Sequence, residues 1–144
     1  MHKNKWIGPL LFAIGVFLIF FLSWKANPNL NETVFIPDWL SDWTDQSRNS
    51  RRRTAVPFVG LSILVAVYLI SIKKTKLVFW LLAWFCLGII VTIAEAGQYF
   101  LPARRVDIKD IIWGGIGAGI GLCLSFVVWQ FFRLFKTKHI GGKK

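Results

Sequence analysis

The sequence predicts an all-α fold, a four-helix transmembrane bundle with short loops and one longer loop between the first two helices. Hydrophobic residues make up 55% of the 144 residues, and the mean hydropathy is +0.53. A soluble domain is roughly 45–50% apolar even when glycine is counted, so much of this surface is expected to face lipid. The apolar residues form four runs of at least 18 residues each, which is enough to cross a bilayer as a helix. The length fits a single domain over residues 1–144.

The first predicted span covers residues 6–24 and contains no charged residue. Trp6 and Trp24 bracket it, as aromatic side chains do at the two interfaces of a membrane. Pro9 falls in the first turn, where a missing N–H costs little. The run is longer than the apolar core of a signal peptide, which is roughly 7–15 residues, so we expect this helix to be retained.

Residues 25–54 form the one long predicted loop, which carries four of the seven acidic residues and ends in an arginine cluster. Within it, the stretch 36–43 has Pro37 near its start and Trp39 and Trp43 four residues apart, so the two rings would share one face of a helix. Two interpretations stay open: a short helix in the membrane interface, or a loop whose Trp rings cap the bundle.

The second predicted span covers residues 55–72 and the third covers 77–98. Thr54 is placed to cap the start of the second helix, with Pro57 in its first turn. Because only residues 73–76 separate the two apolar runs, we expect an antiparallel hairpin of helices. Pro102 is expected to end the third helix.

The fourth predicted span covers residues 108–132, and a basic tail over 133–144 follows it. In lipid every backbone polar group pairs within the helix, and small residues let neighbouring helices approach closely. We therefore expect the glycines of this span to form a packing groove. If the third helix packs into it, Glu95 and Gln98 would come near Asp107 and Asp110. The helix-packing glycines are Gly114, Gly115, Gly117, Gly119 and Gly121.

The net charge of +11 does not indicate nucleic-acid binding, because the basic residues lie at the ends of the apolar runs. There they would meet phospholipid headgroups, so membrane lipids are the expected partners and nucleic acid is not. Ten Lys and Arg lie on the side of both termini and eight on the other side. This excess predicts termini in the cytoplasm.

Neither a metal ion nor a cofactor is predicted. Cys86 and Cys123 lie inside apolar runs, where the simplest interpretation is two small buried hydrophobic side chains. His2 and His139 lie in opposite tails, and no Cys or His spacing is that of a zinc site. The oligomeric state is left open by the sequence.

A polar cluster between the third and fourth runs is the candidate site, because polar groups at the edge of a bilayer are costly to keep there. The first two members share one face of a helix, and the last two begin the next helix, where its dipole favours negative charge. The arginines between them suit a carboxylate or a phosphate. The candidate ligand-binding residues are Glu95, Gln98, Arg104, Arg105, Asp107 and Asp110.

Three functions stay open for this cluster. It would bind the headgroup of a phosphate-bearing lipid or of a lipid-linked cell-wall precursor. Alternatively, the chain would be an intramembrane enzyme acting on such a molecule, with Glu95 as general acid or base, although no nucleophile–base set is evident. In the third interpretation the cluster is a structural clasp that joins the third and fourth helices.

The pattern Glu-x-x-Gln-x-x-x-Pro-x-Arg-x-x-Asp-x-x-Asp, followed by a glycine-rich apolar helix, resembles the VanZ-like family of small bacterial membrane proteins. The resemblance implies a four-helix protein of the bacterial cytoplasmic membrane and cell envelope. It also implies a link to reduced susceptibility to teicoplanin-type glycopeptides. The chain departs from the family at Ala94, where an acid often stands, and at Gly114, where an Asn is usual. The matching residues are Glu95, Gln98, Pro102, Arg104, Asp107, Asp110, Gly117 and Gly121.

Overall fold

A computed structural model describes residues 6–25, 50–102 and 106–140, with the backbone alone described at 50–53 and 136–140. Over these residues the chain forms four α-helices, one short 3-10 helix and no strand. The predicted all-α bundle is therefore confirmed. The elements are α1 (Ile7–Ser23), α3 (Ser50–Ser71), α4 (Leu77–Gly97), η2 (Gln98–Phe100) and α5 (Ile108–Ile140).

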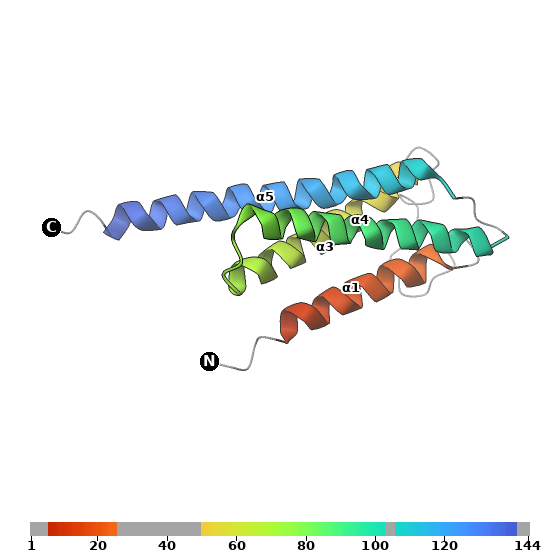
Figure 1. Cartoon of the computed structure of the whole chain (residues 1–144), viewed down its shortest axis with the longest axis horizontal. Helices are drawn as coiled ribbons and strands as arrows, with labels where there is room; N and C mark the ends of the chain where they lie inside the picture. The colour runs from red at the N-terminus through yellow and green to blue at the C-terminus, as the bar shows by residue number, and fades with distance from the viewer. Residues whose placement is uncertain (1–5, 26–49, 103–105, 141–144) are drawn as a thin grey trace, which may run out of the picture.

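Successive helices run in opposite directions along the long axis of the bundle (Figure 1). One end, which we call the turn end, holds residues 72–76 between α3 and α4, together with the start of α1. The other end, which we call the connection end, holds η2 and the start of α5. The candidate residues Glu95, Gln98 and Asp107 all belong to the connection end.

Three helices are long and apolar enough to cross a membrane, over Thr54–Ser71, Leu77–Phe100 and Ile108–Phe135. The apolar helix α1 is shorter, at 17 residues. Its length is roughly 26 Å, slightly less than the hydrocarbon thickness of a bilayer. Helix α1 begins and ends within one residue of the predicted first span, and Pro9 lies in its first turn as expected.

The closest helix packing in the bundle is between α3 and α5, through two glycines of α5. A Cβ added to Gly117 would meet the backbone carbonyl of Ala55, and one added to Gly121 would meet the hydroxyl of Ser62. The third predicted helix, now α4, contacts α5 at Gly114 and Gly119, but it does not fill the groove at Gly117 and Gly121. The groove holds α3, because Ala55 and Ser62 are small enough to let the two backbones approach.

Helix α4 contacts the neighbouring face of α5. A Cβ on Gly114 would meet the Val91 side chain, while the Trp84 indole Nε1 donates a hydrogen bond to the Gly115 carbonyl oxygen at 2.9 Å. The same indole lies against Gly119. A Cβ on Gly115 itself would meet no atom within 4 Å. Four of the five glycines thus divide between two packing faces, with Gly117 and Gly121 against α3 and with Gly114 and Gly119 against α4.

Helix α1 is the most weakly held of the four, since none of its residues is buried. It lies against α3 at two of its own glycines, where a Cβ on Gly8 would meet the Tyr68 ring and one on Gly15 would meet Leu61. The core itself comes from the other three helices. Its buried hydrophobic residues are Phe58, Leu61, Ala66, Trp80, Leu87, Val91, Ala118 and Leu122.

Two helix ends differ from the sequence prediction. Helix α3 begins at Ser50, so Thr54 is inside the helix rather than its cap, and Pro57 is an interior proline. Helix α5 continues to Ile140 instead of ending at residue 132. Basic residues are good helix formers, and neither glycine nor proline interrupts the chain after the apolar run until residue 141. The length of an apolar run therefore indicates which part of a helix is hydrophobic, but not where the helix ends.

The two cysteines are also placed differently from the expectation. Cys86 and Cys123 are both exposed on the bundle surface, where the sequence analysis expected buried side chains. Apolar surroundings in the sequence do not separate a core position from one that faces acyl chains, because both are hydrophobic.

Trp80 carries the one buried side-chain nitrogen or oxygen without a hydrogen-bond partner among the described residues. Its ring is 5% exposed and packs edge-on against Phe126, with the ring centroids 5.2 Å apart. An unpaired buried N–H costs about 1–3 kcal/mol. We therefore expect Trp80→Phe to leave the free energy of unfolding within about 1 kcal/mol of the parent, because removing this donor offsets the smaller ring.

The matched control is Trp84→Phe, the same change one turn later on α4. There the indole N–H donates to Gly115, so its loss should cost about 1 kcal/mol. The measurement for both variants is the free energy of unfolding from reversible unfolding in mixed detergent micelles. A Trp80→Phe variant that loses clearly more stability than Trp84→Phe would mean that the Trp80 N–H is paired in the folded protein.

Candidate functional site

Glu95 lies near the end of α4 and is only 3% exposed. Its two carboxylate oxygens accept hydrogen bonds from different parts of the chain. The Gln98 side-chain Nε2 donates to Oε2 at 2.9 Å, and the Asp107 backbone N–H donates to Oε1 at 2.8 Å. Glu95 thereby joins the end of α4 to the residue that precedes α5. We call Glu95, Gln98 and Asp107 the clasp.

Asp107 also caps helix α5. Its Oδ1 accepts a hydrogen bond from the backbone N–H of Lys109 at 2.9 Å, and its carbonyl oxygen accepts one from the backbone N–H of Asp110, also at 2.9 Å. An Asp at this position satisfies a backbone donor that has no partner within the helix and places negative charge at the positive end of the dipole. The exposed carboxylate of Asp107 is thus occupied in starting α5.

The structure brings three of the six candidate ligand-binding residues into direct hydrogen-bond contact, namely the clasp. Asp110 lies in the first turn of α5, where it is partly buried. Arg104 and Arg105 lie outside the described residues, as does the predicted interfacial stretch 36–43. Proximity across the α4–α5 connection follows from the sequence, because Glu95 and Gln98 end one helix and Asp107 begins the next.

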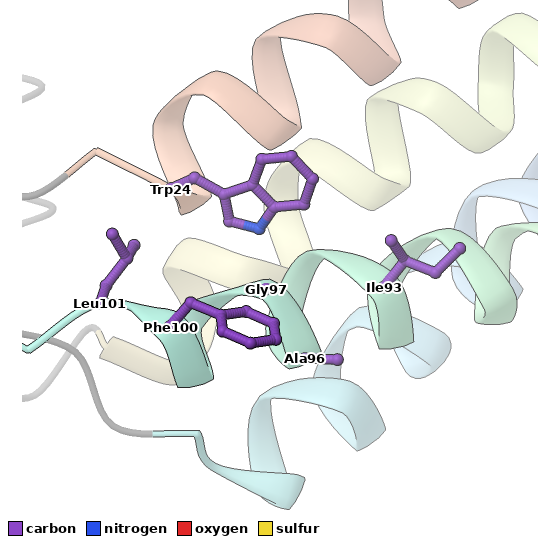
Figure 2. A pocket seen from close by; sticks show the side chains of 6 residues that line it. All are labelled: Trp24, Ile93, Ala96, Gly97, Phe100 and Leu101. Carbon is purple, nitrogen blue, oxygen red and sulfur yellow. The ribbon is translucent and has the colours of Figure 1, made fainter.

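An apolar hollow of about 520 Å³ opens at the connection end, and none of the three clasp residues lines it (Figure 2). Figure 2 shows the Trp24 ring above the α4 ribbon at Gly97, with Phe100 on the same side. Tyr99 and Phe100 are 79% and 81% exposed, as is typical of aromatic residues at a membrane interface. The hollow is lined by Trp24, Ile93, Ala96, Gly97, Phe100 and Leu101.

Trp24 has a structural role that the sequence analysis did not find. Its indole Nε1 donates a hydrogen bond to the Ala94 carbonyl oxygen at 3.0 Å, and its ring stacks on Phe20 with centroids 4.9 Å apart. A Cβ on Gly97 would meet the indole, so only glycine lets Trp24 reach the backbone of α4. The sequence signal that could have indicated this close approach is Gly97, an isolated glycine beside the polar cluster.

The site contains acceptors and amide donors but no metal cluster. Among the residues that the structure describes, no group of three or more His, Cys, Asp or Glu side chains could hold a metal ion.

No family model, no curated protein and no solved structure matches this chain. The function must therefore be argued from the residues of the connection end themselves.

Proposed function

We propose that this chain is a VanZ-like integral membrane protein of the bacterial cytoplasmic membrane, with both termini in the cytoplasm. In this proposal the connection end binds the phosphate-bearing headgroup of a membrane lipid or of a lipid-linked cell-wall precursor. Arg104 and Arg105 are the phosphate ligands, since guanidinium groups pair with phosphate in two parallel hydrogen bonds. The clasp fixes Asp107, which follows Arg105 by two residues in the sequence.

The single observation that carries the proposal is the apolar hollow at the same end of the bundle as the clasp, with Leu101 in its lining. Leu101 lines the hollow, and Asp107 is fixed by Glu95, so the segment with the two arginines begins and ends at described, hydrogen-bonded residues. A lipid presents an apolar chain next to a phosphate. An apolar hollow lined by Leu101, three residues before Arg104 in the sequence, would be complementary to both parts of such a molecule if the arginines supply the charge.

Membrane insertion is supported by the three long apolar helices and by what they expose. Large apolar side chains such as Leu82, Phe85 and Val127 are 55–65% exposed along α4 and α5. A soluble monomer rarely exposes such continuous apolar surface, because contact with water would be unfavourable. In a bilayer the same side chains contact acyl chains. The shorter α1 fits a thin or locally adjusted bilayer.

The enzyme alternative receives less support from the geometry of Glu95. A general acid or base must reach the proton that it transfers. Both carboxylate oxygens of Glu95 accept hydrogen bonds from the protein, and the side chain is 3% exposed. These contacts favour a structural role for Glu95 in the clasp over proton transfer to a substrate.

The resemblance to the VanZ-like family also suggests an influence on susceptibility to teicoplanin-type glycopeptides.

Replacing Arg104 and Arg105 together by alanine should weaken lipid-phosphate binding by more than about a hundredfold, since charge-assisted hydrogen bonds contribute roughly 1.5–3 kcal/mol each and at least two are lost. Native mass spectrometry of the full chain, titrated with phosphatidic acid and with undecaprenyl phosphate, measures the loss. The two probes distinguish a phospholipid from a precursor carrier. The unfolding transition in detergent should stay unchanged, because the clasp is intact.

The matched control changes Lys74 and Lys76 to alanine. It removes the same charge from exposed residues at the turn end and should leave binding at the connection end within twofold of the parent, as expected for screened distant charges. Equal lipid binding by the parent and by the double arginine variant would contradict the proposed function, whatever its effect on stability.

A further inference from the structure

Helix α5 continues past the point at which α3 and α4 turn (Figure 1). The Phe126 ring packs against Trp80, which lies one turn from the start of α4 at Leu77. Because α4 and α5 run in opposite directions, one further turn of α5 brings Gln130 level with Leu77. The remaining residues, Phe131–Ile140, extend roughly 15 Å beyond the start of α4.

The first part of this extension is apolar and aromatic. Four large side chains in it are between 57% and 68% exposed, and the rings of Phe131 and Phe135 lie 4.5 Å apart. The guanidinium group of Arg133 lies 5.5 Å from the centre of the Trp129 ring. The four exposed residues are Phe131, Phe132, Leu134 and Phe135. The sequence then adds Lys136 and Lys138.

Such an extension does not suit water. An unpacked helix of about ten residues is marginally stable in water, and four exposed large apolar side chains add to its cost. The headgroup region on one side of a bilayer is roughly 5–7 Å thick. The five residues Phe131–Phe135 rise about 7 Å along a helix, which matches that layer when Leu77 marks the edge of the hydrocarbon.

The turn end is also uniformly basic over the described residues. All three described acidic residues, Glu95, Asp107 and Asp110, belong to the connection end. The turn between α3 and α4 contributes three exposed lysines, and Lys74 Nζ lies 4.8 Å over the Phe79 ring. Aromatic rings with basic groups above them are complementary to anionic headgroups, and each Lys or Arg near an anionic surface raises its affinity about fivefold.

We propose that the extension of α5 from Phe131 to Ile140 binds the anionic phospholipid headgroups of the leaflet at the turn end. The segment Phe131–Phe135, with its four large apolar side chains, occupies the headgroup layer. Arg133, together with Lys136 and Lys138, neutralises the phosphates. This inference rests on membrane insertion, which is part of the proposed function, but it is independent of lipid binding at the connection end.

The test uses the full chain in lipid nanodiscs, with Cys86 and Cys123 replaced by alanine and a bimane label on Phe135→Cys. Acrylamide, a neutral aqueous quencher, reports the access of water to the label. Replacing part of the phosphatidylcholine by phosphatidylglycerol should lower the quenching constant severalfold, and high salt should restore it because the attraction is screened. A constant that is the same in both lipids would overturn the proposal.

Changing Arg133, Lys136 and Lys138 together to glutamine should abolish the effect of phosphatidylglycerol. The matched control changes Arg51, Arg52 and Arg53 to glutamine, which removes equal charge from the opposite end and should retain the effect. If the extension variant keeps it, the basic residues are not the ligands and the proposal is wrong. A label on the native, exposed Cys86, in the middle of α4, separately reports whether the bundle is inserted at all.

Discussion

Replacing Gly117 by alanine is expected to destabilise the bundle by roughly 3 kcal/mol, the upper part of the range for an added methyl group in a packed interior. The new Cβ would meet the backbone carbonyl of Ala55 on α3. A backbone cannot rotate away as a flexible side chain can, so the two helices must separate. Because α3 and α5 form the most extensive helix contact in the bundle, the loss should lower the free energy of unfolding of the whole protein.

Gly115→Ala is the matched control, since it lies two residues away on the same helix. A Cβ at Gly115 would meet no atom within 4 Å, and alanine is the better helix former by about 1 kcal/mol. We expect this variant to be as stable as the parent or more so. Unfolding of both variants in mixed micelles provides the comparison. Equal destabilisation by Gly115→Ala and Gly117→Ala would show that the α3–α5 contact is not the one described.

Glu95→Ala is expected to cost about 3 kcal/mol, because it leaves the backbone N–H of Asp107 and the amide of Gln98, which form partly buried hydrogen bonds, without their acceptor. Glu95→Gln retains an acceptor oxygen and should cost about half as much. The measurement is again the free energy of unfolding, together with protease cleavage in the segment between Leu101 and Asp107. Cleavage should increase in the alanine variant, since the clasp no longer holds the start of α5.

Thr92→Ala is the control for the clasp. Thr92 is exposed on the same helix and its hydroxyl donates only to the Gly88 carbonyl oxygen of its own helix, so its loss should change stability by less than about 0.5 kcal/mol. A Glu95→Ala variant as stable as the parent would show that the clasp does not stabilise the fold. The buried carboxylate would then need a functional explanation, and the enzyme alternative would become the stronger one.

The helices of this protein are predictable from its sequence because their exposed and core residues are both apolar, so each helix contains one continuous apolar run. For the same reason the sequence could not distinguish the two surfaces of a span. The exposed Cys86 and the buried Leu87 are neighbours with equally apolar surroundings. Only packing separates them, so the expectation of buried cysteines was wrong.

The helix that fills the glycine groove could not be predicted, because a glycine has no side chain to indicate its partner. The choice depends on the facing residues. Helix α3 offers Ala55 and Ser62, whereas α4 offers the larger Val91 at Gly114. Close approach therefore favours α3. The clasp was more accessible to prediction, since its members lie at two adjacent helix ends where backbone donors need acceptors.

The weak attachment of α1 has a consequence for biogenesis. Helix α1 leaves the ribosome before the other described helices, and its hydrogen-bond partner on α4 is made much later, since Trp24 and its acceptor Ala94 are 70 residues apart in the sequence. Helix α1 can pack on α3 at Gly8 and Gly15 before α4 is made, but it has no buried residue of its own and its hydrogen bond to α4 forms only later. The hydrogen bond from Trp24 to the backbone of α4 is therefore expected to form late in assembly, after α4 has been synthesised.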